Sequence, residues 1–387
     1  MSIDKRFLGL YLHVPFCEHH CAYCDFNTYT ATLENIIVSQ TVDAICDDLI
    51  NSAPAITPCY AVKSIFFGGG TPTFLTSTQL TKLMNTIQKY YDVHEDAEIS
   101  AESNPSRVDS TRFKELILAG FNRLSIGVQS LDNSILKSLD RTHTAQEAID
   151  AFNSARDAGF NNINLDLMYR LPNQTAELWS ESIHKALELQ PEHLSIYSLT
   201  LEPGTRFERM HKGGNLPLPD EDEEIKMMEY AITTLKMHGY DHYEVSNFAK
   251  SGYRCRHNQI YWNNEEYLGV GPGAVSYLNG RRWKRERLPS RYANKVFHNQ
   301  DLTVEEETLS KLRTMGETII LGLRLLDGIS LRRLNERFEI DPMEFYSTVI
   351  KSGIEQNLLS LNGHILKLTH SGLLIADTIS EQFLISD

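Results

Sequence analysis

Residues 17–24 form the run Cys17-Glu18-His19-His20-Cys21-Ala22-Tyr23-Cys24, in which three cysteines follow the spacing C-x3-C-x2-C. A mostly apolar run at residues 8–14 comes shortly before it and predicts a strand. Three thiolates leave a zinc site one ligand short, although His13, His19, His20 or Asp25 is able to complete it. Free thiols that bind no metal are another alternative. A [4Fe–4S] cluster has four irons, so three cysteines hold it and leave one iron open to a small molecule. The spacing favours the cluster.

The composition is that of an ordinary globular protein, with 387 residues, 41% hydrophobic and 23% charged. The net charge of −14 argues against a general binder of nucleic acid or anionic membrane. Cys46, Cys59 and Cys255 are scattered, which predicts packing residues and not a disulfide framework. Because no secretory signal or apolar run of about 20 residues is visible, we expect a soluble, cytoplasmic chain without a transmembrane segment.

Short β-branched runs alternate with longer helical patterns over the first 200 residues. Helical spacing is found at residues 35–51 and 77–90, and Gly120 and Gly159 are placed to end two further helices. The predicted strands are at residues 8–14, 64–67, 97–101, 123–127, 162–167 and 194–198. Six strand–helix units predict an α/β fold with a mostly parallel sheet, enough for most of a barrel.

The pattern changes after residue 205. A loop is predicted at residues 206–222, then a helix at 220–238, a strand at 242–245 and a loop-rich aromatic stretch at 246–295. We expect a domain boundary near Gln300-Asp301, which gives domains 1–300 and 301–387.

The second domain is predicted to be small, mainly helical and similar to a winged helix. Its helices are expected at residues 305–323, 330–338 and 342–352, followed by a hairpin around Asn362-Gly363. With 8 Lys and Arg against 14 Asp and Glu, this domain is too acidic for a DNA reader.

A glycine run, Gly68-Gly69-Gly70-Thr71-Pro72, directly follows the second predicted strand. Successive glycines let backbone amides and carbonyls approach a ligand without a Cβ in the way. Alone, the run is equally typical of a flexible turn, and it is not the G-x-G-x-x-G pattern of a dinucleotide site.

Together, the cysteine loop and the GGGTP run resemble the radical S-adenosylmethionine (SAM) superfamily. In that superfamily the amino and carboxylate groups of SAM chelate the open iron, and GGGTP contacts the methionyl part of SAM. The opening Tyr11-Leu12-His13-Val14-Pro15-Phe16-Cys17 is similar to the HemN/HemW branch, and the likeness runs from about residue 8 to the C-terminus. The branch contains oxygen-independent coproporphyrinogen III oxidases and HemW heme chaperones. The resemblance implies an incomplete parallel (β/α)6 barrel with a C-terminal domain.

The resemblance also implies a SAM site and three cluster ligands. The ligands are Cys17, Cys21 and Cys24. Glu102 and Asp166 end predicted strands, so their carboxylates are placed to accept hydrogen bonds from ribose hydroxyls. The positions that match SAM-lining residues of the family are Tyr11, Tyr23, Gly69, Gly70, Thr71, Glu102, Gln129, Arg141, Asp166 and Val275.

Two features separate the branches. The oxidases carry a further cysteine two residues after the third ligand, where this chain has Phe26. The run His257-Asn258-Gln259-Ile260-Tyr261-Trp262 matches the H-N-x-x-Y-W motif that marks HemW, which assigns His257, Asn258, Tyr261 and Trp262 to heme. A neutral imidazole is a common heme ligand, although core aromatics and a satisfied loop histidine also explain the run. Arg254 and Arg256 are placed to pair with propionates, and Cys255 is an alternative ligand.

We therefore expect a HemW-like heme chaperone that binds a [4Fe–4S] cluster, SAM and heme and passes heme to an acceptor protein. The alternatives are an oxygen-independent coproporphyrinogen III dehydrogenase, which Phe26 argues against, and another radical SAM enzyme acting on heme. No catalytic residue is assigned, whether the chain is an enzyme is left open, and coproporphyrinogen dehydrogenase activity is not expected. The family implies a flavodoxin-type or ferredoxin-type electron donor. The heme acceptor is left open, and a membrane-associated protein is one of the alternatives. Whether the chain forms a homodimer is also left open.

Overall fold

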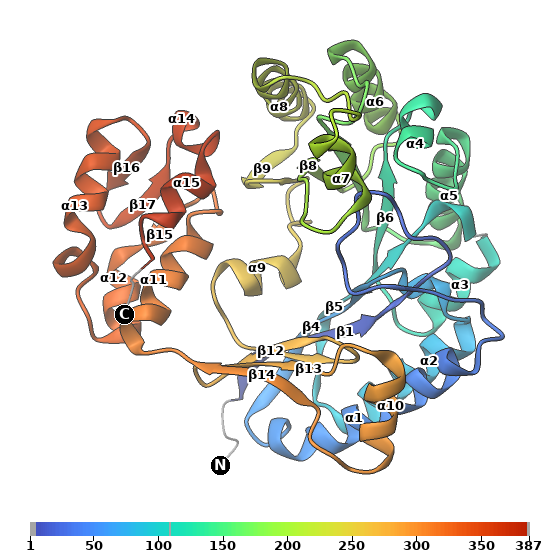
Figure 1. Ribbon diagram of the computed structural model, residues 1–387. Coiled ribbons are helices and arrows are strands. Elements are labelled where there is room, and N and C mark those ends of the chain that lie inside the picture. Colours follow the sequence, from blue (N-terminus) through green and yellow to red (C-terminus); the bar gives the residue numbers. More distant parts are fainter. Residues whose placement is uncertain (1–4, 108–109, 385–387) are drawn as a thin grey trace.

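The computed structural model describes residues 5–107 and 110–384 (Figure 1). Its centre is a twelve-stranded sheet in the order β14-β13-β12-β11-β1-β4-β5-β6-β7-β8-β10-β9. Six neighbouring strands are parallel and alternate with helices along the chain. They are β1 (Arg6–Val14), β4 (Tyr60–Gly69), β5 (Val93–Ser103), β6 (Arg123–Gln129), β7 (Ile163–Tyr169) and β8 (His193–Ser198). Because β14 and β9 are its edges, the described sheet stays open, and the expected incomplete parallel (β/α)6 barrel is confirmed.

Shorter strands extend both edges of the parallel core. Beside β8 lie the antiparallel strands β10 (Asn247–Ala249) and β9 (Asp241–Glu244). Beside β1 lies the parallel strand β11, followed by three antiparallel strands. These four are β11 (Tyr267–Val270), β12 (Val275–Leu278), β13 (Arg281–Arg285) and β14 (Thr303–Thr308).

Most of the helices in this part cover the outer face of the sheet, whereas the helix at residues 256–262 lies between the sheet and the C-terminal part (Figure 1). In α2, Thr76 and Gln79 form a capping box, and the buried residues recur at helical spacing. Gly120 and Gly159 have φ values of 101° and 112°, so the two predicted helix-ending glycines are confirmed. None of the described helices is both long and apolar enough to cross a membrane. The helices are α1 (Ile36–Ile56), α2 (Ser77–Tyr90), α3 (Ser110–Leu118), α4 (Asn133–Ser138), α5 (Ala145–Ala158), α6 (Ala176–Glu188), α7 (Arg206–Lys212), α8 (Glu221–Met237), α9 (Arg256–Trp262) and α10 (Pro289–Phe297).

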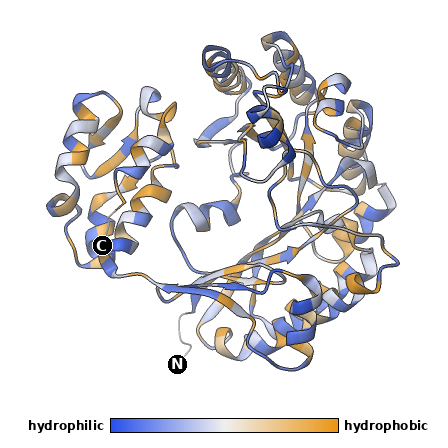
Figure 2. Ribbon diagram, in the orientation of Figure 1, coloured by the Kyte–Doolittle hydropathy of each residue, from blue (hydrophilic) through white to orange (hydrophobic). Residues whose placement is uncertain are grey.

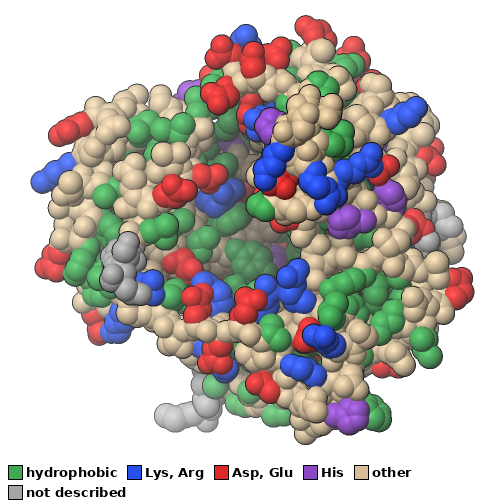
Figure 3. Space-filling model, in the orientation of Figure 1, with side chains coloured by type: hydrophobic (Ala, Val, Ile, Leu, Met, Phe, Trp, Pro, Cys, Tyr) green, Lys and Arg blue, Asp and Glu red, His purple; other side chains and the backbone are tan. Residues whose placement is uncertain are grey.

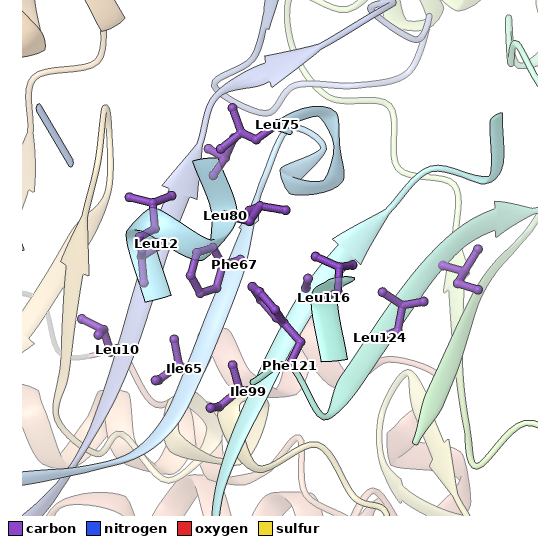
Figure 4. Packing of buried hydrophobic residues seen from close by; sticks show 14 of the residues in the cluster. Leu10, Leu12, Ile65, Phe67, Leu75, Leu80, Ile99, Leu116, Phe121 and Leu124 are labelled. Atoms are coloured by element: carbon purple, nitrogen blue, oxygen red, sulfur yellow. The ribbon is translucent and has the colours of Figure 1, made fainter. Parts of the chain in front are cut away.

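The main hydrophobic core lies between the strands and these helices. Phe67 of β4 and Phe121 meet edge to face with ring centroids 4.9 Å apart, and Leu80 of α2 and Leu116 of α3 lie beside them (Figure 4). Hydrophobic residues concentrate on the strands and on the helix sides that face them (Figure 2). This core fixes the strand ends, where the predicted site residues lie.

The C-terminal part has a core of its own, made by buried residues from Met315 to Phe383. Its hairpin turns at Gly363, which has a φ of 62°, as Asn362-Gly363 predicts. The C-terminal part joins the large sheet through two backbone hydrogen bonds of 3.0 Å. They run from Val245 N to Arg324 O and from Leu326 N to Tyr243 O. The domain division at residues 300 and 301 stays a prediction. The elements are α11 (Lys311–Gly322), β15 (Ile329–Ser330), α12 (Leu331–Phe338), α13 (Pro342–Glu355), β16 (Leu359–Asn362), β17 (Ile365–Leu368), α14 (His370–Leu373) and α15 (Ala376–Glu381).

Three of the sequence expectations are wrong. The helix expected at residues 305–323 is strand β14 followed by α11, because Glu305, Glu306 and Glu307 form ion pairs with basic side chains of β13. The loop-rich stretch at 246–295 contains four short strands and two helices, and the loop at 206–222 contains α7. These elements depend on pairing with distant parts of the chain.

A buried ion pair ties α1 to the edge strands. Asp48 accepts from the Arg285 guanidinium at 3.1 Å and from the Tyr292 hydroxyl at 2.6 Å, and all three side chains are buried. We expect Asp48→Ala to lower the free energy of unfolding by about 3–5 kcal/mol, because it leaves a buried cation unpaired. Denaturant unfolding measures this, and Asp47→Ala on the exposed side of α1 should change it by less than about 0.5 kcal/mol. Equal effects of the two variants would contradict the assignment.

Candidate functional site

A cavity of about 380 Å³ opens at the carboxyl ends of the parallel strands, within the size range of about 300–1,000 Å³ that is typical of ligand pockets. It gathers most of the residues predicted for the cluster and SAM. These are Cys17, Cys21, Cys24, Tyr23, Gly69, Gly70, Thr71, Glu102, Gln129, Arg141 and Asp166. A wider depression of about 840 Å³ lies outside the barrel, on α1, α2 and α3.

The three cysteines enter the cavity from one short loop. Cys17 ends β2 (Phe16–Cys17), which pairs with β3 (Tyr29–Thr30), and Cys21 and Cys24 lie on the loop between these strands. All three are half-buried. Thr71 Oγ1 lies 3.5 Å from Cys17 Sγ, and Arg141 Nη1 donates to Cys21 Sγ at 3.5 Å. A hydroxyl and a cation beside the sulfurs suit thiolates that bind a metal centre.

The cavity can be tested for its fit to a cluster. Within residues 5–107 and 110–384, no three His, Cys, Asp or Glu side chains converge on a single-ion site, so the fit rests on the donors and on the space around them. Burial raises the pKa of the Cys17 thiol to about 11 and also raises that of Cys24. Metal binding would therefore release protons here. Three thiols at one pocket, next to a cationic donor, fit a [4Fe–4S] cluster.

The glycine run brings backbone against the cysteine loop. A Cβ on Gly70 would lie 2.6 Å from Phe16 O and 3.0 Å from Cys17 Sγ. Gly69 has a φ of 114°, and a Cβ there would lie 2.6 Å from the His13 ring. Its N–H donates to Glu102 Oε2 at 3.1 Å. Only glycine permits this contact between the run and the cluster loop.

Two half-buried carboxylates, Glu102 and Asp166, and the half-buried guanidinium of Arg141 line the cavity. Burial raises the pKa of Glu102 to about 8, with a smaller contribution from the nearby Asp166, whose pKa burial also raises. Arg141 donates to Gly127 O at 2.7 Å and to Asn104 Oδ1 at 3.1 Å. Its buried Nε has no partner among the described residues. Such carboxylates suit ligand hydroxyls, and the guanidinium suits an anionic group.

Gln129, the last residue of β6, has a φ of 65° although it is not glycine. The left-handed region costs energy for such a residue and is enriched at functional sites. Here it ends the strand at the cavity wall.

Tyr11 and Val275 are not among the cavity-lining residues. The Tyr11 hydroxyl lies 3.0 Å from His13 Nδ1, beneath the glycine run, and Val275 pairs with Lys284 in the edge strands. Sequence analysis missed Ser125, Met168 and Tyr197, which do line the cavity. Met168 follows Asp166 by two residues, so strand alternation was a signal that could have found it.

The residues predicted for heme lie together on α9, away from the cavity lining. His257 is 1% exposed, with Nδ1 2.9 Å from Ser64 Oγ and Nε2 3.0 Å from the Tyr261 hydroxyl. The Arg324 guanidinium lies 4.5 Å from the centre of the Trp262 ring.

The flanking residues also have protein partners. Arg254 pairs with Asp241 and Asp327, Arg256 donates to Asp96 O, and Cys255 is buried beside Glu98. The assignment of His257, Asn258, Tyr261 and Trp262 to heme stays a prediction.

The pKa of Glu102 predicts a pH-dependent stability. The folded chain holds this proton up to about pH 8, whereas the unfolded carboxyl titrates near 4.5. The resulting stability is present at low pH and is lost as pH rises from about 4.5 through about 8. Without ligands, the Tm of the natural chain should fall between pH 5 and pH 9. We expect the fall to be a few degrees smaller in Glu102→Gln, which has no carboxyl group to titrate. Differential scanning calorimetry measures this, and the exposed Glu95→Gln is the control. Parallel curves for all three proteins would contradict the burial argument.

Two family models match the chain. The Radical SAM superfamily model matches residues 11–186, and the HemN C-terminal domain model matches residues 309–375. The solved structure of coproporphyrinogen III oxidase (HemN) from Escherichia coli superposes with a TM-score of 0.86, covering 98% of this chain and 90% of that chain at 23% identity. At that identity the likeness shows a common fold.

An open parallel barrel with these cysteine and glycine loops defines a radical SAM protein, a class that implies a [4Fe–4S] cluster and SAM. Heme chaperone HemW of Bacillus subtilis is 38% identical, over 97% of this chain and 98% of its own. Heme chaperone HemW of Lactococcus lactis is 36% identical, over 97% of each. The chain belongs to the HemW family.

Proposed function

We propose that this chain is a heme chaperone, which binds heme and transfers it to acceptor proteins. The observation that carries the proposal is the 38% identity to a heme chaperone over 97% of the chain. The exposed Phe26 supports it. That side chain is 66% exposed and lines the cavity, at the position where the oxidases of the wider family carry a cysteine.

The cavity is proposed to hold the cluster on Cys17, Cys21 and Cys24 and SAM beside it. When bound, the cluster supplies an iron with an open coordination position and a source of one electron. Gly69, Gly70 and Thr71 would carry the methionyl part of SAM, and Glu102 and Asp166 would accept from its ribose hydroxyls. Tyr23, Gln129 and Arg141 complete the wall. A flavodoxin-type or ferredoxin-type protein is the proposed electron donor.

Heme is proposed to contact α9. Figure 3 shows a hollow between the barrel and the C-terminal part, with hydrophobic side chains at its floor, and Figure 1 shows α9 between these parts. Both ring nitrogens of His257 have protein partners, so iron binding requires that Nε2 leave the Tyr261 hydroxyl or that Nδ1 leave Ser64. Asn258 and Trp262 share the helix. The rearrangement would make heme uptake slower than simple diffusion into an open pocket.

His257→Ala should weaken heme binding about tenfold or more, because it removes the imidazole that is the proposed iron ligand. Titration of the chain with heme, followed by the Soret band, measures the affinity. His298→Ala, an exposed histidine at the end of α10 and outside both α9 and the cavity, is the matched control and should bind as the natural chain does. Natural affinity and an unchanged Soret maximum in His257→Ala would remove this histidine from the proposal.

The chaperone and the oxidase are distinguished by an anaerobic assay. Cluster-reconstituted chain is incubated with SAM, reductant and coproporphyrinogen III, and porphyrin products are measured by mass spectrometry; a parallel sample is titrated with heme. We expect saturable heme binding and no protoporphyrinogen beyond that formed with cluster-free protein. Product over many turnovers, or no heme binding, would contradict the proposed function.

A further inference from the structure

A buried chain of hydrogen bonds connects the start of α9 to the cavity. Cys255, the N-cap of α9, donates its backbone N–H to the Tyr243 hydroxyl at 3.2 Å. That hydroxyl lies 2.8 Å from His193 Nε2, and His193 Nδ1 lies 2.6 Å from Asn164 Oδ1. Asn164 Nδ2 donates to Asp166 Oδ1 at 2.8 Å. Asp166 lines the cavity, so the chain links α9 to the proposed SAM site.

The hydrogen bonds all point in one direction. A backbone N–H can only donate, so Tyr243 accepts from Cys255 and has its own proton free for His193 Nε2. A neutral imidazole that accepts at Nε2 carries its proton on Nδ1, which donates to Asn164 Oδ1. The Asn164 amide then donates to the Asp166 carboxylate. Donors therefore follow one another from the helix to the cavity, an arrangement in which each bond polarises the next.

The side chains that form these hydrogen bonds are isolated from solvent. Tyr243, His193 and Cys255 are 0% exposed, and Asn164 is 1% exposed. Burial and the Arg123 charge hold the pKa of His193 well below its ordinary value, which agrees with a neutral ring. Because no water competes, loss or gain of a bond at one end is felt along the chain.

Both ends suit a coupling role. At the cavity end, Ser125 Oγ donates to Asp166 Oδ2 at 3.0 Å and Asn164 Nδ2 donates to Oδ1 at 2.8 Å, so a ligand hydroxyl that reaches this carboxylate shares it with both donors. At the helix end, Glu98 accepts from the backbone N–H groups of Arg256 and His257 at 3.0 and 3.2 Å. The start of the proposed heme helix is therefore held by Glu98 and by the Tyr243 hydroxyl together.

We propose that Tyr243 and His193 are positioning residues that couple occupation of the cavity by SAM to the order of α9. A vicinal diol that donates to Asp166 competes with Asn164 and Ser125 for the carboxylate. The change passes through His193 and alters the hydrogen bond between the Tyr243 hydroxyl and the Cys255 N–H. The proposal rests on the proposed binding of SAM in the cavity. It adds that the ligand site and the heme helix respond to each other, because coupling between two sites is reciprocal.

Hydrogen exchange of the α9 amides tests the coupling without heme. Cluster-reconstituted chain is compared with and without SAM by mass spectrometry of peptides that cover residues 254–263, in the natural protein and in Tyr243→Phe. Tyr240→Phe is the matched control, since its buried hydroxyl bonds to Pro191 O and lies outside the chain of bonds. SAM affinity is measured on the same samples, and circular dichroism checks folding. If Tyr243→Phe misfolds, His193→Gln interrupts the same connection.

We expect SAM to change α9 exchange about fivefold or more in the natural chain and in Tyr240→Phe. In Tyr243→Phe we expect SAM to bind within about twofold of its natural affinity, with no change in α9 exchange. An unchanged response in Tyr243→Phe, or SAM binding to the natural chain without any response of α9, would overturn the coupling. Absence of SAM binding would overturn it together with the SAM site. A chain that responds to SAM but binds no heme would instead refute the proposed function and leave the coupling standing.

Discussion

Cys21→Ala is expected to remove the iron–sulfur cluster, so that iron and acid-labile sulfide fall from about four of each per chain to near zero. Cys21 lies in the middle of the loop from Cys17 to Cys24, and Arg141 donates to its sulfur. The remaining two thiols cannot hold three irons. Anaerobic reconstitution followed by iron and sulfide analysis measures the result.

Cys59→Ala is the matched control, because Cys59 is exposed and lies outside the cavity. It should keep its full iron and sulfide. Full content in Cys21→Ala would contradict the ligand assignment, and a loss in both variants would mean that the reconstitution reports general damage.

Gly70→Ala should weaken SAM binding about 5-fold to 150-fold. The added Cβ would lie 2.6 Å from Phe16 O, a backbone atom that cannot rotate away. The contact does not involve the ligand, so the methyl group must displace the glycine run from the cysteine loop. Overpacking of this kind costs about 1–3 kcal/mol, and returning the run to its place against SAM would cost about as much, which corresponds to a loss of affinity of about 5-fold to 150-fold. Equilibrium binding of SAM to cluster-loaded protein measures the change.

Gly280→Ala tests whether a strained, less stable fold by itself weakens SAM binding. Gly280 has a φ of 78° in the turn between β12 and β13, and a Cβ there meets no atom within 4 Å. It should bind SAM with natural affinity. Equal SAM affinity in Gly70→Ala and the natural chain would show that the glycine run does not form the SAM site.

Local signals in the sequence were sufficient for the parallel strands and their helices. The capping box at Thr76 and the left-handed Gly159 are read within one helix, and the strand ends then place Glu102 and Asp166 at one cavity. Strand β14 was missed because its stability comes from ion pairs with β13, about 25 residues away in sequence.

The surroundings of His257 were equally inaccessible from the sequence. Ser64, which lies 2.9 Å from its Nδ1, is 193 residues away in sequence, and the motif itself contains no signal that the ring is buried. Likewise, Tyr243, His193 and Asn164 are ordinary strand residues until the sheet places β9, β8 and β7 near one another. Residue motifs identified the family, whereas contacts between distant strands form the hydrogen bonds that link the cavity to α9.

The handover of heme tests the central claim most directly. Chain loaded with heme is mixed separately with the membrane fraction and the soluble protein fraction of heme-depleted cells of the same organism. Loss of its Soret band is followed against the concentration of each fraction, with protease-digested fractions as the control. We predict transfer that accelerates with the concentration of at least one intact fraction and exceeds transfer to its digested form about tenfold or more. Equal rates to the intact and digested forms of both fractions, or a chain that takes up no heme, would contradict heme transfer to an acceptor protein.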